Sequence, residues 1–238
     1  MLERARAFAD AGESATAAVA SATVMLLRDG AEGLEVFMLR RHSAMATSAG
    51  RHVFPGGLVD AADYGDRTAD DAYVIAAIRE TFEETGVLMA TSEEAQLLDL
   101  EGERLALVAH ETTLDEVLGR HNLTADYDAL RPWSHWITPL YEPRRYDTRF
   151  FVARVRDGID TREIADGEAD YAAWLRPADV LANPDVRLMP PTDVTLRELN
   201  TYKFAADVWA AASQRPVTPI LIAIDLDATP PHFVIGTP

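Results

Sequence analysis

The sequence has no cysteine and only one lysine, Lys203, among its 22 basic residues. The absence of thiols excludes disulfide bonds, thiolate nucleophiles and cysteine-ligated zinc, and it fits a reducing cytoplasm, where we expect the protein. Long hydrophobic runs are also missing. The longest weakly polar run, Ser14–Leu27, is too short to cross a membrane as a helix. Acidic residues at Glu3, Asp10 and Glu13 precede it, so we expect no signal peptide.

Positive charge is scarce overall, because 39 acidic residues outweigh the 22 basic ones and give a formal net charge of −17. Such a surface repels nucleic-acid backbones and anionic membranes, so we expect neither as a partner. It would also repel a phosphate-bearing substrate unless bound cations and local arginines screened the encounter. The charge therefore favours a small-molecule partner together with a bound metal.

Strand-like and helix-like segments alternate along the 238 residues. A chain of this length buries a substantial core and is more often one domain than two. We expect an N-terminal arm over 1–19 and a single domain over 20–238, with a helical insert at about 93–123 and a long helix at about 192–213. The alternation predicts an α/β fold with a mixed central sheet. The expected strands cover 20–27, 34–39, 53–58, 134–138, 148–155 and 219–226.

Three carboxylates share one face of a predicted helix in the first half of the chain. Glu80, Glu83 and Glu84 stand at i, i+3 and i+4, so they lie within one helical turn of each other. Like charges at this spacing repel each other by a few tenths of a kcal/mol per pair. A shared divalent cation turns that repulsion into coordination, because hard cations such as Mg²⁺ bind several oxygen ligands. We therefore predict a metal site on this helix.

The run Arg79-Glu80-x-x-Glu83-Glu84-x-Gly86-Val87, preceded by Phe54-Pro55-Gly56-Gly57, resembles the signature box of the Nudix hydrolases. That signature is G-x5-E-x7-R-E-U-x-E-E-x-G-U, where U is a bulky aliphatic residue, and here Thr81 fills the first U position. The first half departs from it: 21 residues separate Gly57 from Arg79 where the signature has 13. We place the eight extra residues within Asp60–Asp71, so that the early Glu is either replaced by Asp71 or lost. The resemblance implies an α/β/α sandwich.

Further segments resemble a branch of that family, the acyl-CoA diphosphatases of the peroxisomal and mitochondrial kind, which carry an insertion inside the box. The shared segments are Arg79–Glu84, Arg144–Thr148, the Pro190-Pro191 step before a helix, and the tail Gly50-x3-Phe54-Pro55-Gly56-Gly57 of a CoA-type motif. Arg41 matches one basic position of that motif, whereas His42 and Ala46 stand where it has Ser and Arg.

The resemblance also implies roles for individual residues. Glu80 and Glu84 would bind Mg²⁺ or Mn²⁺ directly, Glu83 directly or through water, and the Gly56 carbonyl would add a further oxygen. Arg79 would orient Glu83. The base that activates water would be either a box glutamate or a residue of the later acidic loop, which contains Glu163, Asp166, Glu168 and Asp170. Among these we favour Glu168.

Arginines at expected strand ends are candidates for substrate binding, because a guanidinium group binds phosphate through two hydrogen bonds. Arg40 and Arg41 follow one strand, and Arg144 and Arg145 precede another. The alternative is that these arginines are surface charges without a role in binding.

The residues leave three functional hypotheses open. The first is a diphosphatase that cleaves CoA or acyl-CoA to 4'-phosphopantetheine species and adenosine 3',5'-bisphosphate. The second keeps the chemistry but acts on ADP-ribose, NADH or another nucleoside diphosphate derivative. The third is a ligand sensor without turnover, which the intact charged set of Arg79, Glu80, Glu83 and Glu84 disfavours.

The helical stretch 93–123 could cover the pocket or form the contact of a homodimer.

Overall fold

The computed structural model describes residues 2–12, 14–42, 50–92, 95, 98–155, 161, 169–226, 228 and 232–236. The elements are, in chain order, α1 (Leu2–Ala11), β1 (Val19–Gly30), β2 (Gly33–Arg41), β3 (His52–Val53), β4 (Gly56–Leu58), α2 (Ala61–Tyr64), α3 (Ala69–Thr85), α4 (Glu101–Val108), α5 (Leu114–Arg120), the 3-10 turn η2 (Tyr127–Ala129), β5 (Arg131–Ile137), β6 (Tyr146–Arg154), β7 (Ala169–Leu175), α6 (Pro177–Ala182), α7 (Pro190–Leu199), α8 (Ala205–Ala212), β8 (Pro219–Asp225) and β9 (His232–Gly236). No helix in the described part combines the length and apolar character that crossing a membrane needs.

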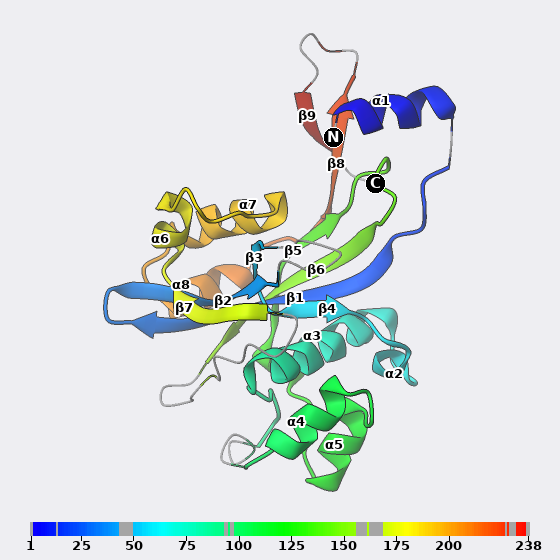
Figure 1. Ribbon diagram of the computed structural model, residues 1–238. Helices are drawn as coiled ribbons and strands as arrows, with labels where there is room; N and C mark the ends of the chain where they lie inside the picture. Colours follow the sequence, from blue (N-terminus) through cyan, green and yellow to red (C-terminus); the bar gives the residue numbers. More distant parts are fainter. Residues whose placement is uncertain are drawn as a thin grey trace.

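The strands form one mixed sheet between two groups of helices (Figure 1). The order is β3-β2-β1-β6-β5-β8-β9, with β4 paired to β1 and β7 paired to β2. β1 runs parallel to β6 and β5 parallel to β8, whereas β1 pairs antiparallel with β2 and β5 pairs antiparallel with β6. The expected α/β fold with a mixed central sheet is confirmed.

The core has two layers, one on each face of the sheet. Successive residues of β1 point to opposite faces, so Val24 belongs to a buried cluster with Ile78 of α3, and Met25 belongs to one with Leu196 of α7. Both faces are covered by helices, which explains why β1 is a continuous apolar run rather than an alternating one. Figure 1 shows α3, α4 and α5 on one side and α6, α7 and α8 on the other.

The strand expected over 53–58 is two short strands, β3 and β4, that pair with different partners. They are separated at Phe54-Pro55, because proline has no N–H to donate to a ladder. The Pro55 carbonyl still accepts a bond of 2.8 Å from the Val24 N–H. β7, which the sequence pattern did not reveal, pairs antiparallel with β2.

The single helix expected over 192–213 is two helices, α7 and α8. The chain leaves α7 at Asn200, and the Thr201 hydroxyl donates to the Glu198 carbonyl. It re-enters a helix at Ala205, whose N–H donates to the Asp29 carboxylate at 2.7 Å. The break lets both helices pack onto the same face of the sheet.

Helix α3, which carries the acidic residues, has well-formed ends. The Thr68 side chain accepts from the Asp71 N–H at its start, and Gly86 adopts a left-handed conformation with φ 75° at its end. Thr81, in place of an aliphatic residue, is fully buried and donates its hydroxyl to the Ala77 carbonyl at 2.7 Å. The buried hydroxyl therefore has a hydrogen-bond partner inside the core.

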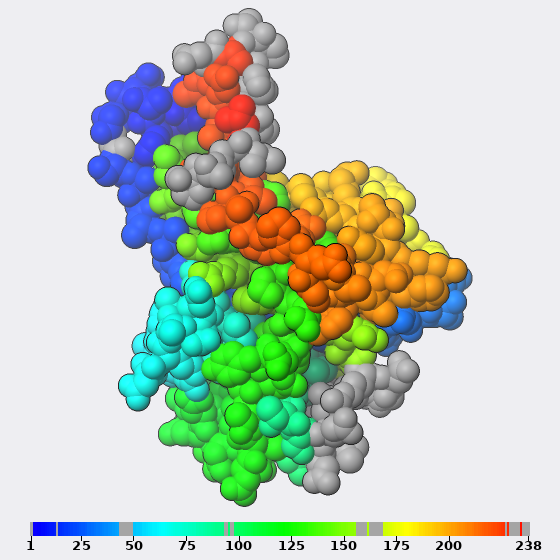
Figure 2. All heavy atoms as spheres, turned by 180° about the vertical axis from the view of Figure 1, so that it is seen from behind, coloured from blue at the N-terminus to red at the C-terminus, as the bar shows by residue number. Residues whose placement is uncertain are grey.

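The two ends of the chain lie on the same side of the molecule. Figures 1 and 2 show α1 and the β8–β9 hairpin extending together beyond the rest of the fold. An ion pair between Arg4 and Glu142 links α1 to the loop before β6. The described part of the predicted helical insert 93–123 contains α4 and α5.

Candidate active site

The acidic face of α3 lies against the glycine pair at the start of β4. The Gly56 N–H donates to Glu84 Oε2 at 2.8 Å. A Cβ on Gly57 would stand 2.3 Å from Glu80 Oε1, so any other residue there would displace this carboxylate. Gly56 has φ 152°, and a Cβ there would stand 2.3 Å from the Ala22 carbonyl oxygen. The two motifs found in the sequence therefore form one site.

Arg79 connects the carboxylates to one another and to β4. Its Nη1 donates to Glu80 Oε1 at 2.9 Å and to Glu83 Oε1 at 3.2 Å. Its Nη2 donates to the Leu58 carbonyl at 2.8 Å. Arg79 is only 6% exposed, so its guanidinium is a buried cation that orients two of the three acidic side chains.

Asp63 of α2 is the buried partner of Arg79, with an exposure of 2%. Arg79 Nε donates to Asp63 Oδ1 at 3.0 Å and Nη2 donates to Oδ2 at 2.9 Å. Asp63 Oδ2 also accepts from the Asp60 N–H at 2.8 Å. Such a fork-to-fork arrangement is the strongest geometry for an arginine–carboxylate pair.

The place of the early acidic residue in the signature therefore needs correction. Our expectation that it is replaced by Asp71 or lost is wrong, because Asp63 follows Gly57 after five residues and pairs with Arg79. Fifteen residues then separate Asp63 from Arg79 where the signature has seven, so the extra residues come after this acid. Asp71 instead accepts from the Thr68 hydroxyl at the start of α3. The five residues between Gly57 and Asp63 match the spacing between Gly and Glu in the signature, and this spacing is the signal that points to Asp63.

The environment of the acidic face disfavours negative charge. Burial raises the pKa of Glu80 to about 7, although the neighbouring Arg79 guanidinium opposes the rise. Burial also raises the pKa of Glu83, again against the opposing effect of Arg79. Carboxylates held in this way gain most from an additional positive charge.

Within the described residues, no three carboxylate or imidazole groups converge as a ready-made metal site. The hydrogen bonds account for this, because Arg79 holds Glu80 and Glu83 while the Gly56 amide holds Glu84. The donor chemistry nevertheless suits a hard divalent cation, since three carboxylates lie within one helical turn and two of them, Glu80 and Glu83, share the Arg79 guanidinium. The predicted metal ligands thus lie together, while their coordination remains a prediction.

A comparison with protein families decides the assignment. The family model of the NUDT19 Nudix domain matches residues 65–199. The chain belongs to the Nudix hydrolase family. The match lies within the NUDT19 type of Nudix domain, the branch that the sequence motifs resembled.

Similar proteins agree with this membership. The Caenorhabditis elegans protein named putative nudix hydrolase 7 is 30% identical over an alignment of 164 positions, which covers 67% of this chain and 53% of that protein. The human protein named acyl-coenzyme A diphosphatase NUDT19 is 27% identical over an alignment of 239 positions, which covers 75% of this chain and 64% of that protein. The chain thus spans between half and two-thirds of the length of these curated relatives. A crystal structure of a NUDIX hydrolase from Alicyclobacillus acidocaldarius matches with a TM-score of 0.73 at 28% identity, covering 83% of this chain and 96% of that one.

Arg40 and Arg41 of this Nudix domain are neighbours at the end of β2, where the pairing with β7 shifts register between them. Arg40 Nε donates to Asp170 at 2.6 Å, and its guanidinium lies 5.7 Å from the centre of the Tyr171 ring. Arg41 bonds through its backbone to Arg51 and Gly50. Arg40 is therefore already paired with a carboxylate, and a substrate phosphate would have to compete for it.

Arg144 and Arg145 lie away from the acidic face. Tyr146, which follows Arg145, pairs with Val19 of β1. Val19 lies three residues, or roughly 10 Å, along β1 from Ala22, the residue that pairs with Gly57. Arg145 donates to the carbonyls of Thr16 and Thr138, and Arg144 is exposed. The structure thus gives Arg145 a role in holding the segment before β1.

The acidic loop before β7 is described only in part. Glu163, Asp166 and Glu168, our preferred base, lie outside the described residues, so that prediction stays a prediction. Asp170, at the start of β7, forms the ion pair with Arg40.

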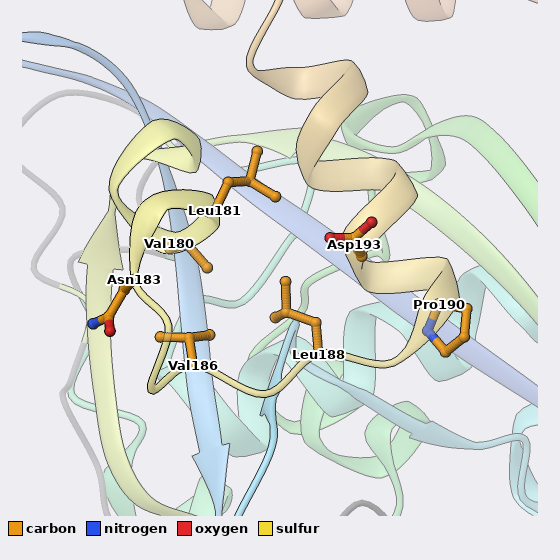
Figure 3. Close-up of a pocket in the computed structure, with 7 residues that line it drawn as sticks. All are labelled: Val180, Leu181, Asn183, Val186, Leu188, Pro190 and Asp193. Atoms are coloured by element: carbon orange, nitrogen blue, oxygen red, sulfur yellow. The ribbon is translucent and has the colours of Figure 1, made fainter.

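A pocket of about 410 Å³ lies between α6 and α7 (Figure 3). Val180 and its neighbour Leu188 belong to the core layer on the face opposite α3. Pro190 opens α7, so the Pro-Pro step starts a helix at this rim. The pocket lies across the sheet from the acidic residues and is separate from their site. Its lining is Val180, Leu181, Asn183, Val186, Leu188, Pro190 and Asp193.

Proposed function

We propose that this Nudix domain hydrolyses the diphosphate bond of CoA or acyl-CoA and needs Mg²⁺ or Mn²⁺ to do so. The products would be a 4'-phosphopantetheine species and adenosine 3',5'-bisphosphate. The observation that carries the proposal is the buried network of Asp63 and Arg79 that orients Glu80 and Glu83 beside Gly56. We infer the substrate from the name of the human relative, an acyl-coenzyme A diphosphatase.

The metal would be held by Glu80, Glu83, Glu84 and the Gly56 carbonyl. When bound, divalent cations neutralise the diphosphate oxygens and lower the pKa of the attacking water. The protein's own contribution is to hold the ligands in place. Arg79 orients Glu80 and Glu83, and the Gly56 amide orients Glu84.

The reaction adds one water across the diphosphate. The water oxygen bonds to one phosphorus, the bridging P–O bond breaks, and a basic side chain accepts a proton from the water. That base is either a carboxylate of the box or one of the acidic loop, where Glu168 is our candidate. Arg41, which matches a basic position of the CoA-type motif, is our first candidate for a contact with substrate phosphates, followed by Arg40, Arg144 and Arg145.

One assay tests this function. The protein is incubated with Mg²⁺ or Mn²⁺ and, separately, CoA, several acyl-CoAs, ADP-ribose, NADH and diadenosine polyphosphates, and the products are identified by mass spectrometry. We expect turnover of CoA species and incorporation of one ¹⁸O from labelled water. Turnover of ADP-ribose or NADH instead of CoA species would overturn the proposed substrate. Binding of CoA without turnover of any compound would make the protein a sensor.

A further inference from the structure

Arg104 is a buried cation on α4, and it contacts the acidic helix rather than solvent. Its side chain is 3% exposed. Its Nη1 donates to the Glu83 carbonyl oxygen at 2.7 Å, while Nε and Nη2 each donate at 2.9 Å to the two oxygens of Glu101. Glu101 therefore fixes the plane of the guanidinium, and the remaining edge points at α3.

The contacted carbonyl lies in the last turn of α3. Carbonyls there have no amide partner within the helix, so each needs a donor from elsewhere. Gly86 supplies its N–H to the Phe82 carbonyl, and Arg104 supplies its guanidinium to the Glu83 carbonyl. A cation at this position also interacts favourably with the helix dipole. Arg104 of α4 thus supplies a hydrogen-bond donor to the end of α3 that carries Glu83 and Glu84.

The start of α3 is tied to the same insert. Arg67 belongs to the extra residues of the box, between α2 and α3. It donates to the Asp115 carboxylate of α5 at 2.5 Å, to the Tyr127 hydroxyl at 3.2 Å and to the Asp63 carbonyl at 3.5 Å. Figure 2 shows the cyan residues around α2 lying against the green residues of α4 and α5. Both ends of the acidic helix are therefore attached to α4–α5.

We propose that Arg104 is a positioning residue for the metal-binding carboxylates and that the α4–α5 insert braces the acidic helix. By holding the last turn of α3, Arg104 keeps the Cα atoms of Glu83 and Glu84 at a fixed distance from Gly56. The carboxylates then bind a cation without first ordering the helix end. This inference rests on the proposed function in that the cation would be the one used in diphosphate hydrolysis.

The test compares Arg104→Met with Arg120→Met. Arg120 lies on α5 and pairs with Glu103 of α4, so the control removes an arginine of the same insert whose ion pair does not involve α3. Mn²⁺ binding is measured without substrate, by electron paramagnetic resonance of free Mn²⁺. Amide hydrogen exchange of residues 82–86 and thermal unfolding are measured in parallel.

We expect Arg104→Met to weaken Mn²⁺ binding about tenfold, in the range seen when a group supporting a metal ligand is removed. Exchange at 82–86 should accelerate by a similar factor, and kcat should fall with little change in KM. Arg104→Lys should recover part of each effect, because an ammonium can still donate to the Glu83 carbonyl. Arg120→Met should match the wild type in all of them.

Unchanged exchange and unchanged Mn²⁺ binding in a folded Arg104→Met variant would overturn the proposal. If that variant does not fold, Glu101→Gln decides, since it removes the negative charge and one acceptor oxygen from the carboxylate that holds the guanidinium, at a less buried site. We expect a smaller loss of the same kind, and wild-type exchange in Glu101→Gln would overturn the proposal. If the wild type hydrolyses no CoA, the proposed function fails while the exchange comparison still decides the role of Arg104.

Discussion

Asp63 and Arg79 form a buried ion pair in which Nε and Nη2 of the arginine face the two oxygens of the aspartate, at 3.0 and 2.9 Å. The same guanidinium reaches the Leu58 carbonyl and the carboxylates of Glu80 and Glu83. A single cation thus ties α2, β4 and α3 together. The geometry of the acidic face depends on this pair, which leads to the first prediction.

Replacing Asp63 by Asn should destabilise the protein by about 3 kcal/mol, because it leaves a buried guanidinium without its main counter-charge. It should also lower the rate of hydrolysis, since Arg79 would no longer hold Glu80 and Glu83 in place. Urea unfolding and steady-state kinetics measure the two effects. The matched control is Asp71→Asn, which alters a partly exposed carboxylate at the start of α3 and should cost about 0.5 kcal/mol. A larger loss of stability and activity in Asp71→Asn than in Asp63→Asn would show that the acidic face depends on Asp71 instead.

Replacing Gly57 by Ala should reduce kcat by roughly 100-fold, because a Cβ at this position would displace the Glu80 carboxylate by an ångström or more. The control is Gly102→Ala on α4, where the added methyl meets no atom within 4 Å. That variant should keep full activity and be slightly more stable, since alanine favours helix. Full activity in Gly57→Ala would mean that Glu80 can move without consequence.

Replacing Glu84 by Gln should lower hydrolysis by roughly 100-fold through the loss of a charged metal ligand. The fold should survive, because the amide oxygen of Gln can still accept from the Gly56 N–H. Circular dichroism checks the fold, and kinetics at saturating Mg²⁺ check the activity. An unchanged kcat would remove Glu84 from the metal site.

The raised pKa of Glu80, at about 7, predicts that metal binding strengthens as pH rises. Below that value the carboxyl carries a proton that a cation must displace, so Mn²⁺ affinity should increase between pH 5.5 and about 8. Titrations of Mn²⁺ at several pH values measure this, and Glu80→Gln should flatten the dependence as well as weaken binding. A wild-type affinity that does not vary with pH would contradict the prediction.

The same shift affects the stability of the metal-free protein. The folded state binds the Glu80 proton more tightly than the unfolded chain, whose carboxyl titrates near 4.5. The contribution of this group to stability is therefore fully present below about pH 4.5 and is lost as pH rises through about 7. Glu80→Gln should remove this slope from a plot of unfolding free energy against pH, and an unchanged slope would assign it to another group.

Several features of the site could be predicted because they depend on residues close together in the chain. The i, i+3, i+4 spacing places Glu80, Glu83 and Glu84 on one face of any helix. The Gly56-Gly57 pair indicates that another group approaches the backbone closely, and in the structure the Glu80 carboxylate lies against Gly57. The apolar run of β1 indicates a strand covered on both faces.

Other features depended on packing between distant segments. The helix expected over 192–213 is two helices, and the N–H of Ala205 that opens the second one donates to Asp29, far away on β1. The strand β7 was missed because its pairing with β2 depends on tertiary contact rather than on a strong local pattern.

The spacing of Glu80, Glu83 and Glu84 already predicts which side chains share the acidic face, because helical periodicity acts over a few residues. The signature spacing from Gly57 marks Asp63 only as a candidate acid, and folding is what brings it into the ion pair with Arg79. Which arginine binds the carbonyl at the end of α3 depends on packing alone, because Arg104 and Glu83 belong to separate elements. Buried charges must find partners wherever packing brings them, and the linear order of residues does not specify that meeting.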